Sequence, residues 1–215
     1  MDSVSYCMGI SIAQNVKNQG LDSINADAFA KGMQQFYASD SLLVSPEKAN
    51  EFLQGYFSQL YQVRVEKQKA EGRKFLEANK TKPGVVTTAS GLQYQIVTEG
   101  TGPKPKATDR ITAHYAGTLI DGKEFDSSIK RGQPATFGVT EVITGWTEAL
   151  QLMPVGSKWK LFIPSELGYG EQGSGRGVIP PHATLIFDIE LLGIETPPPA
   201  ENPKTQKKAN TSPKK

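Results

Sequence analysis

Hydrophobic positions in the first third of the chain recur with a helical period. From Ser45-Pro46 to Val65, apolar residues are spaced three and four apart, and a hydroxyl residue followed by proline is a start signal for a helix. Beyond Val65 the pattern becomes charged and has no broad apolar face. We therefore expect one long helix from residue 46 to about Ala78, whose first half packs and whose second half stands in water.

Two shorter helices are expected before the long one. Residues 1–20 carry apolar side chains around most of the helix, which predicts burial on more than one side, Cys7 included. Asn25 or Ser23 can cap the second helix. About 60 residues in three helices make a marginal core on their own. We therefore expect this part to self-associate, most simply as a two-fold dimer.

After Pro83-Gly84 the hydrophobic period changes from the helical value to two. Apolar and polar residues alternate in four segments, 92–96, 111–119, 159–163 and 185–191. One-faced strands of this kind, separated by turn signals, predict an antiparallel sheet. A short helix from Trp146 to about Leu152 can cover the apolar face, and Gly145 permits a sharp turn into that helix.

The predicted fold class is α+β, in four consecutive parts. We expect a helical dimerisation region at 1–45, a long linker helix at 46–82, a sheet domain wrapped on one short helix at 84–195, and a disordered basic tail at 196–215. The tail holds five lysines against Glu201, a net charge of +4, and is rich in proline. Because no aromatic residue interleaves its lysines, a solvated tail is favoured over a nucleic-acid-binding arm.

Composition excludes several other classes of protein. The chain is 37% hydrophobic and 21% charged. It contains no run of 18 or more apolar residues, which a membrane-spanning helix would require. The first residues lack the basic and apolar regions of a secretory signal, so a cytoplasmic location is expected, with the periplasm as the alternative if a signal has been removed. One cysteine and two distant histidines predict no metal site, and no motif indicates a cofactor.

Aromatic residues are the conspicuous candidates for a site. Trp146 can lay its indole flat as the floor of a cavity, although a lone tryptophan more often serves plain core packing. The aromatic residues that could wall such a cavity are Tyr115, Phe125, Phe137, Tyr169 and Phe187. Asp126 and Arg131 are the polar candidates nearby, and Asp126 taken alone is more simply a turn aspartate.

This combination of many aromatic and few polar groups suits a reaction without proton transfer or a covalent step. Rotation about an X-Pro bond is such a reaction, with a barrier of ~18–20 kcal/mol and an uncatalysed time of tens of seconds or more. The twisted amide loses resonance and becomes less polar. A dry aromatic pocket therefore favours it over the planar ground state.

Five ordered motifs carry a family resemblance. They are His114-Tyr115-Ala116-Gly117-Thr118-Leu119, Asp121-Gly122-Lys123-Glu124-Phe125-Asp126-Ser127-Ser128, Val142-Ile143-Thr144-Gly145-Trp146, Leu167-Gly168-Tyr169-Gly170 and Ile179-Pro180-Pro181-His182-Ala183-Thr184-Leu185-Ile186-Phe187-Asp188. With them the chain resembles the FKBP-type peptidyl-prolyl isomerases. The Ser5-Tyr6…Gly9 start and the long third helix are similar to the macrophage infectivity potentiator-like bacterial subgroup, in which the helical part dimerises and the long helix carries the isomerase domain.

The resemblance implies roles for particular residues. Trp146 would form the floor of a prolyl pocket, the Ile143 N–H and the Tyr169 hydroxyl would hold substrate carbonyls, and Asp126 would be bonded to Tyr115 and held by Arg131. The implied catalytic set is Tyr115, Phe125, Asp126, Ile143, Trp146, Tyr169 and Phe187. The implied substrate-binding set is Arg131, Phe137, Val142 and Ile179.

The expected function is peptidyl-prolyl cis-trans isomerisation in folding proteins, with chaperone-like binding of unfolded chains. The alternative is a chaperone or interaction module that holds prolyl segments without accelerating their rotation. The expected partners are prolyl peptides, unfolded proteins, macrolide inhibitors of the family and a second copy of the chain. Neither nucleic acid nor a membrane is expected.

Overall fold

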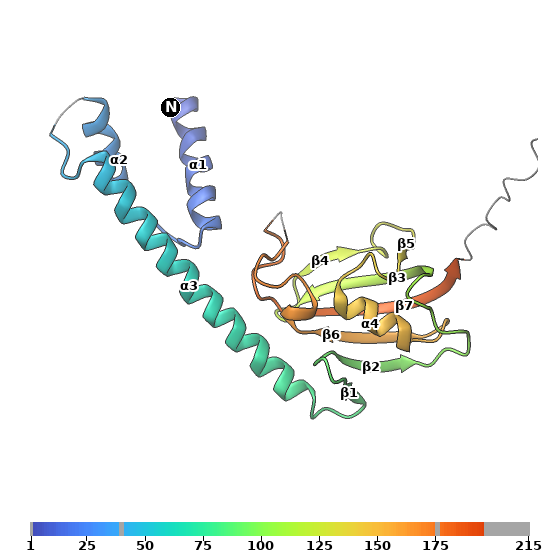
Figure 1. The fold of residues 1–215 in the computed structure, drawn as a ribbon. Helices are drawn as coiled ribbons and strands as arrows, with labels where there is room; N and C mark the ends of the chain where they lie inside the picture. Colours follow the sequence, from blue (N-terminus) through green and yellow to red (C-terminus); the bar gives the residue numbers. More distant parts are fainter. Residues whose placement is uncertain (1, 39–40, 175–176, 196–215) are drawn as a thin grey trace, which may run out of the picture. The chain divides into compact units, whose positions relative to one another are not determined.

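The computed structural model describes residues 2–38, 41–174 and 177–195. The chain divides into two compact units, Met1–Ala70 and Glu71–Lys215, and the division lies inside the long helix α3 (Pro46–Asn79) (Figure 1). The basic tail expected at 196–215 lies outside the described residues.

The first unit is entirely helical and contains α1 (Ser3–Asn18), α2 (Ala26–Tyr37) and the first part of α3. Side-chain caps fix where these helices begin: Asp2 accepts from the backbone N–H of Val4, and Asn25 accepts from that of Ala28. Ser45 accepts from the N–H of Lys48 at the start of α3. The start signals read from the sequence at Asn25 and Ser45 are thus confirmed.

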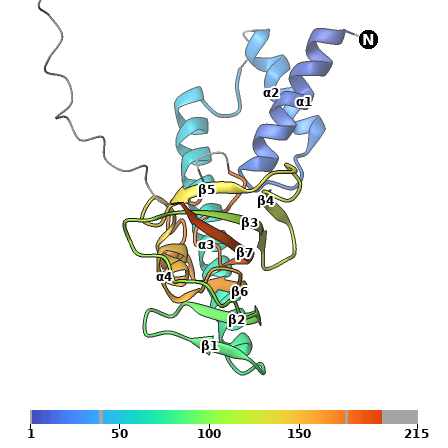
Figure 2. The same ribbon diagram turned by 90° about the vertical axis from the view of Figure 1, so that its right-hand side faces the viewer.

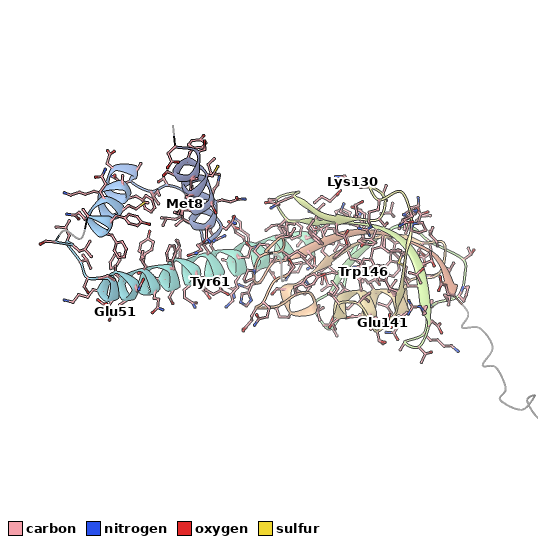
Figure 3. All side chains as sticks on the ribbon, turned by 90° about the horizontal axis from the view of Figure 1, so that it is seen from above. Met8, Glu51, Tyr61, Lys130, Glu141 and Trp146 are labelled. Atoms are coloured by element: carbon pink, nitrogen blue, oxygen red, sulfur yellow. The ribbon has the colours of Figure 1, made fainter. Side chains whose placement is uncertain are left out.

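The apolar faces of the first unit are largely uncovered within one chain. Neither α1 nor α2 contains a buried residue, and Val4, Phe36 and Phe52 are 68%, 59% and 70% exposed. Figure 3 shows the side chains of Met8 and Tyr61 projecting from α1 and α3. Cys7 is exposed, so its predicted burial within the chain is wrong, because three helices cannot enclose a helix that is apolar on most sides.

The second unit is built on one antiparallel sheet. Its strands are β1 (Val85–Thr87), β2 (Gln93–Thr98), β3 (Arg110–Leu119), β4 (Glu124–Ser127), β5 (Ala135–Gly138), β6 (Lys158–Ile163) and β7 (Leu185–Glu195). Their order is β1-β2-β6-β7-β3-β4, with β5 also paired to β3 (Figure 2). β3 therefore contacts three strands, and its register with β7 runs from Arg110 opposite Glu195 to Leu119 opposite Leu185.

Helix α4 (Thr144–Leu152) covers the concave face of the sheet, as the sequence predicts. Its residues Trp146, Ala149 and Leu150 join the alternating apolar residues of β3, β6 and β7 in one buried cluster. We expected Gly145 to permit a sharp turn into the helix, but the structure requires glycine there because the helix packs closely on the sheet. It lies inside the helix, and a Cβ at this position would be 2.6 Å from the side chain of Ile163 on β6, so glycine allows the helix to approach the sheet.

The last turns of α3 pack on the opposite face of the sheet. The rings of Phe75 and Phe162 lie 6.0 Å apart, and Asn79 donates a 2.9 Å hydrogen bond to the buried side chain of Gln93. Gln93 in turn donates to the carbonyl of Leu76. The prediction that the second half of α3 stands in water is therefore wrong for these turns, because the second face of the sheet is apolar at Phe162 and requires a cover.

Three short strands escaped the sequence analysis. β1, β4 and β5 contain three or four residues each, which is too short for an alternating pattern to stand out. Within the described ranges, no helix is long and apolar enough to cross a membrane.

Candidate active site

The site is assembled around the indole of Trp146 at the start of α4. The indole is buried, with 3% exposure, between the helix and the sheet. Three aromatic rings meet it edge to face: Tyr115 from β3 at 5.2 Å, Phe137 from β5 at 5.7 Å and Phe187 from β7 at 5.2 Å. Edge-to-face contacts of this kind hold the ring rigidly in one orientation.

These rings enclose one side of a cavity of about 440 Å³. Its lining residues are Tyr115, Phe125, Asp126, Phe137, Glu141, Val142, Ile143, Trp146, Tyr169 and Phe187. Most of these are apolar, and the few polar groups lie at the rim. Figure 3 shows Trp146 within the sheet domain and Glu141 near its surface, where 64% of the glutamate side chain is exposed. An apolar floor with a sparse polar rim suits a small hydrophobic group attached to a polar backbone.

Gly117 on β3 makes room for two of the cavity walls. A Cβ at this position would lie 2.7 Å from the rings of both Phe125 and Phe187. These two rings pack edge to face at 5.5 Å over the bare glycine backbone. The glycine is therefore required by the close approach of two aromatic walls to the strand.

A polar triad closes the rim beside Tyr115. The Tyr115 hydroxyl donates a 2.5 Å hydrogen bond to Asp126 Oδ2 and accepts one of 2.8 Å from Arg131 Nη2. Arg131 also forms an ion pair with the other carboxylate oxygen, Oδ1. Each of the three groups therefore has two bonds within the triad, which fixes the carboxylate and the phenol relative to the cavity.

The environment keeps Asp126, Tyr115 and Tyr169 each in one protonation state. Burial opposes ionisation of Asp126, but the hydrogen bonds from Tyr115 and Arg131 outweigh it, and the pKa of Asp126 lies below its ordinary value of 3.8. Burial raises the pKa of Tyr115, and the bond to Asp126 adds to this. Burial and the nearby charge of Asp126 also raise the pKa of Tyr169. At neutral pH the rim therefore presents a carboxylate and two intact hydroxyl groups.

Two further donors are available to a ligand. The backbone N–H of Ile143 has no hydrogen-bond partner among the described residues, and it precedes α4, which begins without a side-chain cap. Tyr169, on the loop after the 3-10 turn Ser165–Leu167, is 41% exposed at the cavity rim. Two such donors at one cavity can hold backbone carbonyls of an extended peptide.

The structure brings together most of the residues that the sequence singled out. Nine of the eleven line the cavity, and Arg131 contacts it through Asp126 and Tyr115. Ile179 does not line the cavity; its side chain is 4% exposed and packs into the core cluster.

Glu141 lines the cavity and was missed in the sequence. Its carboxylate accepts hydrogen bonds from Arg110 and from the backbone N–H of Gly138. Its position directly before Val142 and Ile143 was the available signal. No group of three or more acidic, histidine or cysteine side chains in the described ranges could hold a metal ion.

The comparisons with known proteins agree with this geometry. Residues 102–192 match the family model described as FKBP-type peptidyl-prolyl cis-trans isomerase. Residues 1–96 match the model described as the domain amino terminal to FKBP-type peptidyl-prolyl isomerase. The two models together account for nearly all of the described residues.

Relatives of the same kind match over most of their length. The chain is 47% identical over 201 residues to an outer membrane protein MIP of Legionella longbeachae, covering 90% of this chain and 85% of that protein. It is 44% identical over 193 residues to an FKBP-type 22 kDa peptidyl-prolyl cis-trans isomerase of Escherichia coli K12, covering 88% and 93%. The crystal structure of FkpA from Escherichia coli superposes with a TM-score of 0.71 at 35% identity, covering 91% of this chain and 96% of that one.

These relatives do not support the cytoplasmic location expected from the sequence. The Legionella relative is named as an outer membrane protein. What the described residues establish about membranes is limited to the lack of a helix that could cross one.

Proposed function

Because the chain belongs to the FKBP-type peptidyl-prolyl cis-trans isomerases, we propose that the cavity above Trp146 binds the proline of an X-Pro segment and accelerates its rotation. The observation that carries this proposal is the rigid aromatic enclosure of Trp146, with the triad at its rim. No nucleophile or proton-transfer pair is needed, since the reaction breaks no covalent bond.

The chemistry follows from the polarity of the amide. In the planar ground state, resonance places partial charge on the carbonyl oxygen and the imide nitrogen, and water stabilises that charge. At the twisted geometry the resonance is lost, so a water-free aromatic wall raises the ground state relative to the transition state. Turnover of about 1–10³ s⁻¹ from an uncatalysed time of tens of seconds requires roughly 3–7 kcal/mol of such preference.

Each residue of the site has a part in this scheme. Trp146, Tyr115, Phe137 and Phe187 receive the pyrrolidine ring, and Phe125, Val142 and Ile143 complete the enclosure. The Ile143 N–H and the Tyr169 hydroxyl bind substrate carbonyls, which holds the peptide on both sides of the rotating bond. Asp126, fixed by Arg131, orients Tyr115 and keeps a carboxylate facing the bound imide.

A proline-isomerisation assay on a prolyl tetrapeptide tests the function directly. We expect acceleration at submicromolar concentrations of the protein, and competition by macrolide inhibitors of the family. Binding of prolyl peptides without any acceleration would identify the protein instead as a non-catalytic module that holds proline segments.

We further assign dimerisation to residues 1–45 together with the first half of α3. The uncovered apolar residues of α1, α2 and α3 support this assignment, since such faces are unstable in water. Two linked pockets raise the effective concentration of the second site for one unfolded chain. Analytical ultracentrifugation of the whole chain is expected to give a dimer, and the paired replacement of Val4 and Tyr6 by lysine is expected to give a monomer.

A monomer produced in this way separates the two activities. Its turnover of a tetrapeptide should match that of the dimer per pocket, whereas its acceleration of proline-limited protein refolding should fall severalfold. Equal refolding acceleration at matched pocket concentration would exclude a role for the helical unit in binding unfolded chains.

We place the protein in the periplasm, where cell fractionation with an antibody against the chain is expected to recover it.

A further inference from the structure

Of the described residues that line the cavity, Glu141 is the one with no part in the reaction proposed for it. It lies in the loop between β5 and α4, two residues before Ile143, whose backbone N–H we assign to a substrate carbonyl. The Glu141 side chain is 64% exposed. It is therefore next to the bound peptide in our scheme and open to contact with a charged side chain of that peptide.

The carboxylate of Glu141 is held in one position. Its Oε2 accepts a 3.0 Å hydrogen bond from the Gly138 N–H and one of 3.1 Å from Arg110 Nη1. The Glu141 N–H donates in return to the carbonyl of Gly138. A Cβ at Gly138 would lie 2.7 Å from the Glu141 Cδ, so glycine leaves the room that the carboxylate occupies. A side chain fixed in this way loses little conformational entropy when it contacts a ligand.

One oxygen of this carboxylate is available to a ligand. The Oε1 atom of Glu141 has no hydrogen-bond partner among the described residues. Both oxygens of Asp126, in contrast, are occupied, one by Tyr115 and the other by Arg131. An ionised carboxylate accepts about four hydrogen bonds on its two oxygens. Glu141 can therefore accept from a donor on a ligand while it stays bonded to Arg110.

The two carboxylates reach the cavity from different points along β3. Asp126 is paired with Gly117 of β3, and Gly138 is paired with Arg110 of the same strand. Gly117 and Arg110 are seven residues apart, which is roughly 20 Å along a twisted strand. Because Glu141 is bonded to Gly138 and Arg110, it contacts a different part of a bound peptide from Asp126.

The charges around Glu141 favour a cation at this end of the cavity. Arg110 is bonded to Glu141 and lies opposite Glu195 in the register with β7. These three side chains comprise two carboxylates and one guanidinium, a net charge of −1. At the other end, Asp126 and Arg131 form a neutral pair.

We propose that Glu141 is a specificity-determining residue, which favours substrates that carry a lysine or arginine next to the proline, on the side whose carbonyl the Ile143 N–H binds. The charged group of that substrate residue donates to Glu141 Oε1. The inference rests on the proposed function, because it uses the same cavity and the same bound segment. Exposed charge pairs change an equilibrium by a factor of about 1.5–5. Glu141 therefore sets a preference among prolyl segments and does not decide whether one is bound.

The first experiment uses prolyl peptides that carry either lysine or norleucine directly before or directly after the proline. Norleucine has the carbon chain of lysine without the ammonium group, so the lysine-to-norleucine ratio of kcat/KM isolates the charge. We expect Glu141→Gln to lower this ratio about 1.5–5-fold at one of the two positions. Glutamine keeps an acceptor for the Gly138 N–H, so a purely structural role of Glu141 would leave the ratio unchanged.

Arg110→Gln should change the ratio in the opposite direction. It removes the cation that competes for the carboxylate, while the Gly138 N–H still holds Glu141, and the ratio should rise. Glu124→Gln and Lys130→Gln are the matched controls, because they make the same charge changes in an ion pair that does not line the cavity. A ratio that Glu141→Gln leaves unchanged at both positions, or that Glu124→Gln lowers equally, would overturn the assignment.

The second experiment observes the contact without relying on catalysis. The Gly138 amide donates to the Glu141 carboxylate, so its NMR resonance reports on that group. The lysine peptide should shift this resonance more than the norleucine peptide, and 0.5 M salt should reduce the difference. Tighter binding of the lysine peptide without acceleration of any X-Pro bond would sustain the inference and refute the isomerase function. Acceleration of both peptides with equal shifts would sustain the function and refute the inference.

Discussion

The Tyr115 hydroxyl lies 2.5 Å from Asp126 Oδ2, and this bond joins a wall of the cavity to the carboxylate at its rim. Tyr115 comes from the middle of β3, where its ring also touches Trp146, and Asp126 comes from β4. The bond therefore couples the pairing of two strands to the position of the carboxylate at the cavity rim. Replacing either residue should lower substrate turnover more than it lowers the free energy of unfolding.

Asp126→Ala tests this directly. The variant loses the partner that fixes Tyr115, and we expect kcat/KM for a prolyl tetrapeptide to fall about 3–10-fold, the equivalent of roughly 1 kcal/mol for one net hydrogen bond. The free energy of unfolding should change by less than about 1 kcal/mol, because the ion pair with Arg131 is largely exposed. Glu124→Gln, which breaks the exposed pair with Lys130, is the control and should change neither quantity. Full turnover in Asp126→Ala would show that the carboxylate has no part in the site.

The pH dependence of turnover should be flat over a wide range. The pKa of Asp126 is lowered below 3.8, so its stabilising interactions are present above pH 3.8 and are lost as the pH falls through the lower folded value. The pKa values of Tyr115 and Tyr169 are raised above 10.0, so their hydroxyls persist until the pH rises through the folded values. We expect constant kcat/KM between about pH 5 and pH 9.

Arg131→Gln should move the acid limb of that profile. The variant removes one of the groups that lower the pKa of Asp126, and the pH at which activity declines should rise. A titration of the Asp126 carboxyl carbon by NMR provides the matching measurement. Lys130→Gln removes a neighbouring positive charge that pairs with Glu124 and should leave the acid limb in place. If both variants shift the limb equally, general charge and not the triad sets the pKa.

Gly117→Ala should close the cavity from the side of the sheet. Its Cβ would lie 2.7 Å from the rings of Phe125 and Phe187, so both walls must move. We expect a loss of about 1–3 kcal/mol in the free energy of unfolding, as for overpacked cores, together with a higher KM. Gly193→Ala is the matched control on β7, because a Cβ at that position meets nothing within 4 Å. Denaturant unfolding and steady-state kinetics measure both effects.

The sheet domain should be more stable with the end of α3 than without it. A fragment of residues 71–195 retains Phe75 against Phe162 and Asn79 against Gln93, whereas a fragment of residues 84–195 loses both contacts. The difference in unfolding free energy should be roughly 2–4 kcal/mol, from one buried aromatic ring and its neighbouring hydrogen bonds. Both fragments keep all the cavity residues, so their tetrapeptide turnover at low temperature should agree. Equal melting temperatures would show that the helix end contributes no stability.

Sequence reasoning found the cavity because its chemistry is carried by residue types that stand out. Trp146 follows a glycine in the first turn of α4, and Tyr115 and Phe187 follow an alternation that places them on the face toward α4. Asp126 and Arg131 stood out only as polar candidates near the aromatic residues, and the family resemblance supplied their roles and that of Ile143. Ile179 was included with its motif, although the structure places it in the core.

What escaped the sequence depends on contacts between distant segments. The alternating pattern of the strand predicts that Gln93 faces solvent. Gln93 is buried because the end of α3 packs on that face of the sheet and bonds to its side chain. The same contact explains why the last turns of α3 pack instead of standing in water. Glu141 escaped because a single glutamate in a loop has no pattern, and its partners Arg110 and Gly138 belong to β3 and β5.

The start of α4 has a consequence for attempts to make this protein more robust. Ile143 is the N-cap residue of α4, and no side chain is bonded to the first turn of the helix. Serine or aspartate at an N-cap ordinarily adds about 1 kcal/mol of stability. This position is therefore an obvious target for a substitution meant to raise the melting temperature. The replacement would set a polar group at the mouth of the apolar cavity, at the residue whose backbone N–H has no hydrogen-bond partner among the described residues. In the peptide-binding mode that we propose, a substrate carbonyl takes the place of this missing cap, so a capped variant should gain thermal stability and lose turnover.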